Sequence, residues 1–312
     1  MARAFWTADF YFESGRVKVR TTGADIAFDR ALVEEALVWF AYYLPVRVRA
    51  AWMRLTRPGP RIWFTPHRPR PWYLVWAAAA WSGARLARSP DQADAAMFFE
   101  DAAQGLSPNS GPEPHLNFGC TDVSKSHVAR VFEQVFGYPL ALDPALARGP
   151  VVEKGEANGV HDGRIVEAPC PARTDKTYQR LIDNTAACGR FVDDLRTPCV
   201  GGAPVLVFIK RRPTVDRFAN HNSSVSLVTP AAVFSADEIE AIGRFCMAMQ
   251  LDWGGLDILR DRASGRLYVV DVNKTDMGPP IALPLAAKLR ATRLLGDALL
   301  ALIAGHTAKA RA

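Results

Sequence analysis

The order of apolar and polar positions along the chain predicts a mixture of strands and helices. Three short apolar runs, at residues 95–100, 205–209 and 267–272, are typical of buried strands. Residues 283–303 instead place apolar side chains at helical spacing, which predicts an amphipathic helix. Because both periodicities occur in one chain, the pattern indicates an α+β fold.

Further helices are indicated by their periodicity and their boundary residues. Apolar residues at helical spacing predict a helix over residues 31–43. Another helix follows Ser124 and ends at Gly137. Ser235 and Glu238 form a capping box, in which each residue satisfies a free backbone N–H group at a helix start, so we expect a helix that reaches about residue 249.

Two stretches predict irregular structure. Residues 58–71 contain five prolines and predict a surface loop, and residues 101–116 are rich in Gly, Pro, Ser and Asn and mark a candidate domain boundary. Between them we expect an Ala-rich helix that reaches residue 86. Residues 1–30 alternate weakly and supply either an edge strand or an arm.

Composition narrows the class of protein. The chain has 312 residues, of which 49% are hydrophobic and 22% charged, as in ordinary globular proteins. Its net charge of +6 favours anionic partners such as nucleotides and phosphates. Five widely spaced cysteines without a CxxC pair indicate reduced thiols. Since neither a secretion signal nor a membrane span is evident, we expect a cytoplasmic protein, with the inner face of the membrane as an alternative location.

Tryptophan and arginine are concentrated in residues 31–90, which hold six of the eight tryptophans. This mixture has three interpretations. The tryptophans form the core of a leading domain, or they sit at a membrane interface beside arginines that attract anionic headgroups, or they stack on nucleobases. The first interpretation is favoured, peripheral membrane contact is the second, and nucleic acid is the least favoured.

The strongest chemical signal lies in residues 256–273, which predict a β-hairpin with polar side chains. Asp257 lies on the first strand, and Asp271 and Asn273 are alternate residues of the second, so both point to one face. The hairpin brings Asp257 beside them. Three oxygen-bearing side chains on adjacent strands suit Mg²⁺, which leaves its other positions to phosphate and water.

This hairpin resembles the terminal metal-binding motif of the ATP-grasp superfamily, where an acid on one strand precedes Glu-x-Asn on the next. Within this superfamily, the hairpin is similar to that of one branch, which contains glutathione synthetase, the ribosomal-protein glutamate ligases and D-alanine–D-alanine ligase. The resemblance implies that Asp257, Asp271 and Asn273 hold Mg²⁺, or Mn²⁺ as an alternative, against the phosphates of ATP. Asp271 stands where Glu is usual, and residues 274–279 replace the usual Pro-Gly.

Other segments resemble the same superfamily in the same order. The helix start at 122–138 implies that Lys125 contacts ATP, and the strand and glycine loop at 150–163 imply the same of Lys154. Residues 178–183 resemble the hinge that binds adenine and ribose. Three residues of this hinge are therefore candidates for nucleotide binding: Gln179, Leu181 and Asp183.

Basic residues follow on the next strand. Lys210, Arg211 and Arg212 alternate faces, so we expect one or two of them to point at phosphate or at an anionic substrate. By the resemblance, Lys210 belongs to the nucleotide site, and Arg211 or Arg212 to catalysis. The segment 217–222 resembles an Arg-x-x-Asn motif of the amino-acid ligases, which implies that Asn220 or Asn222 meets the γ-phosphate or the acceptor.

The resemblance implies three parts: a leading α/β domain of residues 1–105, a small ATP-grasp subdomain of 106–195, and a large subdomain of 196–312 with the metal site. It also implies an ATP-dependent ligase that forms an acyl phosphate. A kinase on the same fold, acting on a hydroxyl of a small-molecule or lipid acceptor, is the first alternative, and a non-enzymatic protein that binds a nucleotide or an anionic surface is the second. Motifs of other nucleotide-binding and hydrolase folds, such as GxxxxGKS/T and GxSxG, are absent from the sequence.

Overall fold

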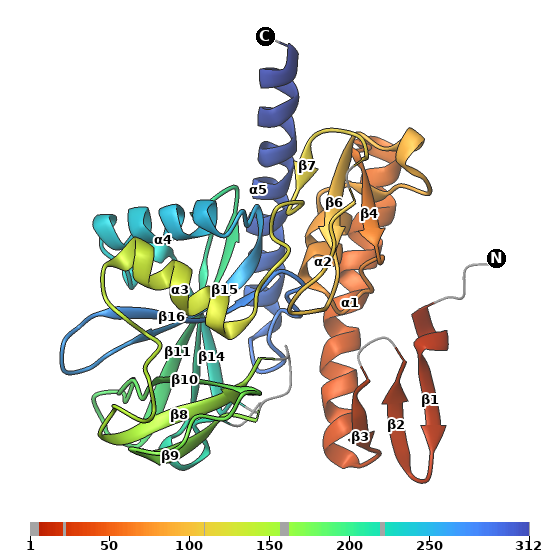
Figure 1. Ribbon diagram of the computed structural model, residues 1–312. Coiled ribbons are helices and arrows are strands. Elements are labelled where there is room, and N and C mark those ends of the chain that lie inside the picture. The colour runs from red at the N-terminus through yellow and green to blue at the C-terminus, as the bar shows by residue number, and fades with distance from the viewer. Residues whose placement is uncertain (1–5, 21–22, 109, 157–161, 219–221, 312) are drawn as a thin grey trace.

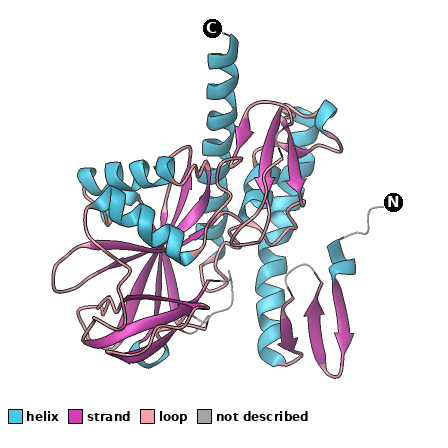
Figure 2. Ribbon diagram, in the orientation of Figure 1, coloured by secondary structure: helices cyan, strands magenta, loops and turns pink. Residues whose placement is uncertain are grey.

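The computed structural model describes residues 6–20, 23–108, 110–156, 162–218 and 222–311, with side chains up to residue 306. Four sheets and five α-helices within these ranges form two bodies on either side of the long helix α5 (Leu285–Arg311) (Figure 1). Strands gather in the left body, and helices flank the smaller sheet of the right body (Figure 2). Within the described residues, no helix is both long and apolar enough to cross a bilayer.

The right body is built on a parallel four-stranded sheet in the order β5-β4-β6-β7. Its strands are β4 (Arg61–Pro66), β5 (Arg85–Leu86), β6 (Ala95–Phe99) and β7 (His115–Leu116). All five residues of β6 are buried, as its apolar run predicts. Helices α1 (Arg30–Thr56) and α2 (Leu74–Trp81) pack together, and both contact α5.

An antiparallel sheet at the N-terminus lies beside α1, at the lower right of Figure 1. Its strands are β1 (Phe10–Glu13), β2 (Arg16–Val19) and β3 (Asp25–Ala27), preceded by a short 3₁₀ helix at Trp6–Asp9. The carboxylate of Asp9 forms an ion pair with Arg70, in which Nε lies 2.6 Å from Oδ2. Trp6 packs edge-on against Trp39 and Tyr43 of α1. These contacts attach the small sheet to the right body.

The left body contains a six-stranded antiparallel sheet in the order β14-β13-β11-β15-β16, with β12 paired to β11. The strands are β11 (Phe191–Val200), β12 (Ala203–Pro204), β13 (Val207–Pro213), β14 (Ser224–Val228), β15 (Trp253–Arg260) and β16 (Leu267–Asn273). Helices α3 (Lys125–Phe136) and α4 (Ala236–Ala248) pack on one face of this sheet. Helix α5 and part of the right body cover one end of the opposite face.

A separate three-stranded sheet lies over the remaining part of that opposite face, in the order β10-β8-β9. Its strands are β8 (Gly149–Gly155), β9 (Arg164–Ala168) and β10 (Lys176–Arg180). It has a small core of its own around Val151, Ala168 and Tyr178. The face of the six-stranded sheet that α5 leaves uncovered therefore looks across a gap at a second sheet.

Several predicted boundaries are confirmed and some are wrong. The capping box of Ser235 and Glu238 forms with both of its hydrogen bonds, and Gly137 ends α3 in a left-handed conformation with φ of 77°. The proline-rich segment is not a loop throughout, because β4 lies within it and buries Ile62 completely. The first helix extends 13 residues beyond the predicted end at residue 43, and Pro45 lies inside it.

Candidate functional site

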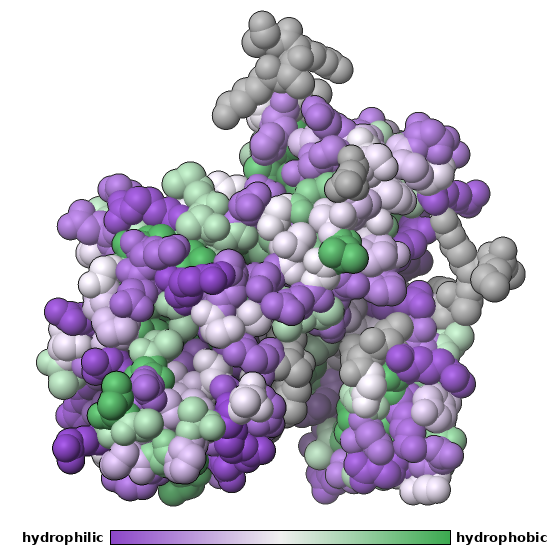
Figure 3. Space-filling view, in the orientation of Figure 1, coloured by the Kyte–Doolittle hydropathy of each residue, from purple (hydrophilic) through white to green (hydrophobic). Residues whose placement is uncertain are grey.

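A cavity of about 710 Å³ lies between the three-stranded sheet and the uncovered face of the six-stranded sheet. That volume is within the range of small-molecule binding sites. The space-filling surface is also hollowed beside this region, between the left body and the N-terminal sheet (Figure 3). Gly23 and Ala24 of the N-terminal sheet's last connection reach the cavity rim.

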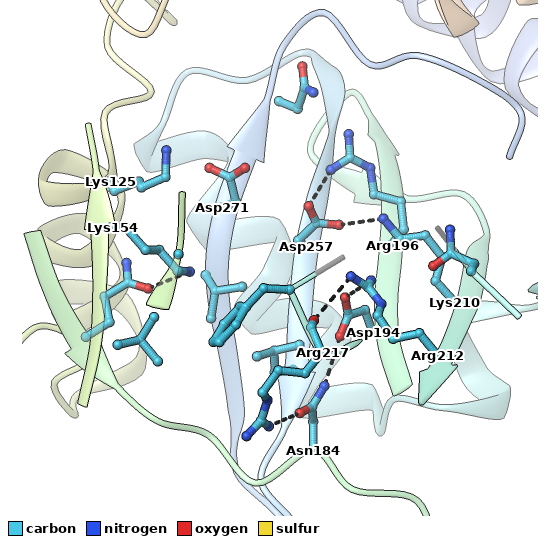
Figure 4. A pocket seen from close by; sticks show the side chains of 18 of the residues that line it. Lys125, Lys154, Asn184, Asp194, Arg196, Lys210, Arg212, Arg217, Asp257 and Asp271 are labelled. Atoms are coloured by element: carbon cyan, nitrogen blue, oxygen red, sulfur yellow. Dashed lines mark hydrogen bonds and ion pairs between the residues drawn. The ribbon is translucent and has the colours of Figure 1, made fainter. Parts of the chain in front are cut away.

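The hairpin β15–β16 brings the three predicted metal ligands to the cavity. Asp257 and Asp271 are directly opposed in register, and Asn273 pairs with Gly255 two positions further along the hairpin. All three side chains line the cavity. Figure 4 shows both carboxylates on one face of the sheet. Strand alternation explains this arrangement, since residues two apart share a face.

Arg196 of β11 holds two carboxylates at this end of the site. Its Nη1 donates to Asp257 Oδ2 at 2.8 Å, and its Nη2 donates to Asp276. Lys210 of β13 adds a second positive charge, with Nζ 3.6 Å from Asp257 Oδ1. Burial raises the pKa of Asp257, but Arg196 and Lys210 outweigh burial, so the pKa lies well below its usual range. Asp257 is therefore an anion at neutral pH.

The donor set suits a hard divalent cation. Oδ1 of Asp257 is buried, and no described residue donates a hydrogen bond to it. Burial raises the pKa of the opposing Asp271, although Lys125 lowers it. Two carboxylates that face each other repel, and a divalent cation between them removes that repulsion. Among the described residues no group of three His, Cys, Asp or Glu side chains could hold a metal alone. A cation here would therefore be coordinated by two carboxylates and one amide oxygen of the protein, together with oxygens of a bound substrate.

Two lysines face these carboxylates from the other side of the cavity (Figure 4). Lys125 is the first residue of α3, and Lys154 lies on β8 of the three-stranded sheet. Nζ of Lys154 donates to Gln179 Oε1 at 3.0 Å. Burial lowers the pKa of Lys154, while the charge of Asp271 raises it. The glycine loop predicted after Lys154 falls largely on residues 157–161, outside the described residues.

The predicted hinge segment divides between the cavity and solvent. Gln179 is buried and lines the cavity, together with Leu181. Asp183 is exposed and does not line the cavity, because its Oδ1 accepts from the N–H of Thr185 at 3.1 Å. Its neighbour Asn184 takes the inward position. Residues 181–184 follow β10 and do not alternate between two faces as strand residues do. The sequence therefore could not predict which of these side chains points into the cavity.

The basic run on β13 also divides. Lys210 and Arg212 line the cavity, whereas Arg211 points away and pairs with Asp193, with Nη2 to Oδ2 at 2.6 Å. The structure therefore does not bring Arg211 to the site, because adjacent strand residues face opposite ways. Asn220 lies outside the described residues, whereas Asn222 lines the cavity.

Charged residues without a role predicted from the sequence also line the cavity, among them Asp194, Arg196 and Arg217. Asp194 binds Arg212 and also accepts from Asn184 Nδ2 at 2.9 Å. Arg217 Nη2 donates to Asn184 Oδ1 at 2.9 Å. Asp194 and Arg196 are alternate residues of one strand, as are Lys210 and Arg212, and that shared parity was the available signal.

The end of the cavity nearest the right body is lined by acidic residues. Asp101 and Asp276 both line it, with Thr275 between them, and Thr275 Oγ1 donates to Asp101 Oδ1 at 2.8 Å. Oδ2 of Asp276 is buried and accepts no hydrogen bond within the part of the chain that the structure describes. The N–H of Leu74 donates to the backbone oxygen of Asp276 at 2.8 Å, so the segment after Asn273 is joined to the right body.

Comparison with solved structures identifies this architecture. No family model matches the chain, and no curated protein matches its sequence. The ATP-grasp ligase PsnB, complexed with a minimal precursor, superposes with a TM-score of 0.51 at 12% identity, over 78% of this chain and 99% of that chain. A structure of PsnB with a phosphomimetic precursor variant, Mg and ADP gives the same TM-score and identity, over 98% of that chain. The D-alanine–D-alanine ligase from Bacillus anthracis gives a TM-score of 0.47 at 12% identity, over 80% of this chain and 98% of that chain.

The chain therefore has the ATP-grasp fold, a mixed helix and sheet architecture. The subdomain limits at 106–195 and 196–312 stay predictions. In the structure, α3 packs with the six-stranded sheet, and β11 of that sheet begins at Phe191.

Proposed function

We propose that this protein is an Mg-ATP-dependent ligase that activates a carboxylate as an acyl phosphate for attack by an amine. The observation that carries the proposal is the cavity in which Lys125 and Lys154 face Asp257 and Asp271 across the space between two sheets. Lysines that face two carboxylates across a cavity match the needs of a metal-bound triphosphate. The ATP-grasp fold supports this function.

In this proposal the nucleotide lies along the three-stranded sheet. Gln179, Leu181 and Asn184 would contact the base and ribose, and Lys154 would bind a phosphate through a charge-assisted hydrogen bond. Asp257, Asp271 and Asn273 would hold Mg²⁺, which supplies charge neutralisation at the transferring phosphoryl group. Arg212 and Lys210 would stabilise the negative charge that develops during transfer.

The acidic end of the cavity supports an amine acceptor over the hydroxyl of a kinase substrate. Asp276 presents a buried carboxylate oxygen that no described protein group satisfies, and Asp101 lies nearby. An unsatisfied buried oxygen is costly, and an ammonium or amine N–H group would satisfy it. Gly23 and Ala24 at the rim would let an extended acceptor, including a peptide, enter from the side of the N-terminal sheet.

Asp271→Asn tests the metal assignment. We expect Mg-ATP to raise the melting temperature of the unmodified protein, by the equivalent of about 2.7 kcal/mol at a hundredfold excess over Kd. In Asp271→Asn the weaker cation ligand should raise the Kd for Mg-ATP at least about tenfold, which is about 1.4 kcal/mol. The measurements are thermal shift and calorimetric titration with the non-hydrolysable analogue AMPPNP.

Asp193→Asn is the matched control, since this aspartate pairs with Arg211 outside the cavity. The metal assignment fails if both variants bind Mg-AMPPNP like the unmodified chain. Product analysis separates the reactions: a ligase releases ADP and free phosphate, whereas a kinase releases ADP and a phosphorylated acceptor.

A further inference from the structure

One face of α1 carries a row of exposed apolar residues. Large apolar side chains on this face are between 42% and 85% exposed. With the exposed Ala51 they form the α1 stripe: Val33, Leu37, Phe40, Leu44, Val48, Ala51 and Leu55. At 100° per residue, all seven lie within about 40° of one line along the helix. Isolated exposed apolar residues are ordinary, but a continuous row along a 27-residue helix marks an interaction surface.

Most of the stripe faces away from the rest of the molecule, and only Phe40 among its members has an aromatic contact outside α1, with the ring of Trp6 at 6.4 Å between centroids, within the described residues. The buried residues of α1 include Tyr42, Val46 and Ala50, which pack against α2 and α5. Tyr42 also donates or accepts a 2.7 Å hydrogen bond with Thr292 of α5. These residues lie on the opposite side of the helix from Leu44. The helix therefore has two apolar faces, of which the described chain covers one.

The spacing of the stripe reads the same in both directions. Successive members are separated by 4, 3, 4, 4, 3 and 4 residues, and Leu44 is the midpoint. The row is thus an 11-residue repeat, which drifts by only about 20° around the helix axis per repeat. A second copy running in the opposite direction would place Val33 against Leu55, Phe40 against Val48, and Leu37 against the small Ala51. Leu44 would meet its own copy.

We propose that α1 is the interface of a homodimer, in which two copies cross antiparallel about a two-fold axis beside Leu44. A two-fold interface must be self-complementary, and a stripe that is symmetric about its midpoint meets that condition. The six larger side chains expose on the order of 100 Å² each. With the polar flanks, that approaches the roughly 800 Å² per partner of a standard interface.

A second copy accounts for these observations better than a membrane surface does. A membrane imposes no relation between the two ends of a stripe, whereas a two-fold axis requires this symmetry. The charge of α1 suits an anionic bilayer as well, because the helix carries Arg30, Arg47, Arg49 and Arg54 beside Glu34 and Glu35. Membrane binding is therefore the rival outcome of the test. The dimer does not depend on the proposed ligase activity.

Association can be measured on the full-length chain. We expect a mass of twice 34.2 kDa by sedimentation or by light scattering after size exclusion. Leu44→Glu places two carboxylates together at the axis and should raise the dimer Kd at least about tenfold. Leu106→Glu, at a residue that is 93% exposed and lies outside α1, should leave the dimer Kd unchanged. A monomeric unmodified chain overturns the proposal, as does Leu44-dependent binding of monomers to phosphatidylglycerol vesicles.

Disulfide trapping tests the register without perturbing the interface. The background is Cys188→Ser, since Cys188 is an exposed free thiol. On mild oxidation Leu44→Cys should cross-link to its own copy. Val33→Cys should not, because antiparallel copies hold the two positions about 33 Å apart. An equal mixture of Val33→Cys and Leu55→Cys should cross-link. Efficient self-linking of Val33→Cys, or none by Leu44→Cys, overturns the proposed arrangement.

Discussion

At the scale of single residues, the cavity is organised by buried charges that hold one another in place. Arg196 bridges Asp257 and Asp276, and the pair of Asp194 and Arg212 lies beside it on the same face. Such side chains keep their positions before a ligand arrives, so less free energy is spent on ordering them during binding. Removing one member would leave its partner buried and uncompensated.

The charge of Lys154 should make nucleotide binding depend on pH. Burial lowers the pKa of this lysine from the usual 10.5, so it loses its proton at a lower pH than a surface lysine does. The Kd for Mg-AMPPNP should therefore be lowest while Lys154 is charged, and should rise up to about tenfold as the pH increases through that lowered pKa. The measurement is calorimetric titration between neutral and alkaline pH.

Lys154→Arg is the control for this pH dependence. Arginine stays protonated throughout the range, so the alkaline rise in Kd should disappear even if binding is weaker overall. Parallel pH profiles for the two proteins would assign the alkaline loss to another group.

How much of the site could be predicted from sequence follows from strand parity. Asp257, Asp271 and Asn273 lie on two regular strands, so their common face could be predicted, and the structure brings them to one cavity. Arg211 and Arg212 could not be told apart without knowing which face is covered. Asp183 lies in an irregular segment, where a hydrogen bond to Thr185 decides the direction of the side chain.

At the scale of elements, periodicity predicted most helices and strands. The predictions were wrong where prolines occur, at β4 and at the end of α1. β4 forms among prolines because Ile62 and Phe64 enter the core while Pro58 and Pro60 precede the strand. Pro45 did not end α1, because the helix is held by packing on both sides of it, through Tyr42 and Val46. Tertiary packing, which the sequence pattern does not show, outweighed local preference in both elements.

Close helix packing gives a prediction at the same scale. A Cβ atom at Gly296 of α5 would lie 2.7 Å from the backbone oxygen of Ala78 in α2. Gly296→Ala should push these helices apart and lower the free energy of unfolding by about 1–3 kcal/mol. Gly305→Ala lies in the same helix with nothing within 4 Å and should instead raise it by roughly 0.5–1 kcal/mol. Urea unfolding of both variants measures the difference, and equal shifts would contradict the close contact.

At the scale of the whole molecule, the two bodies share one core. Leu74 and Met97 of the right body belong to the same buried cluster as Phe208 and Trp253 of the six-stranded sheet, with Leu295 of α5. The acidic segment at Asp276 is also joined to the right body through Leu74. The distance between the right body and the hairpin β15–β16 is therefore fixed by packing.

This shared core predicts that the two bodies unfold together. Leu74→Ala should lower the free energy of unfolding by about 2–5 kcal/mol. Tryptophan fluorescence reports mainly on the right body and circular dichroism on the whole chain, and the two unfolding curves should shift together. Leu146→Ala, at a residue 81% exposed, is the control. Separate transitions for the two probes would show that the bodies fold independently.

The three-stranded sheet differs from both bodies, because it keeps a core of its own around Val151 and Tyr178. It can therefore tilt as a unit, with Lys154 on its surface, while the packing elsewhere stays intact. A bound triphosphate would connect this sheet to the hairpin β15–β16, which packing holds in place. Nucleotide binding and closure of the cavity would then occur together. Under the proposed function, we expect the spent nucleotide to leave only when the sheet swings back, which makes reopening a candidate for the slowest step of each cycle.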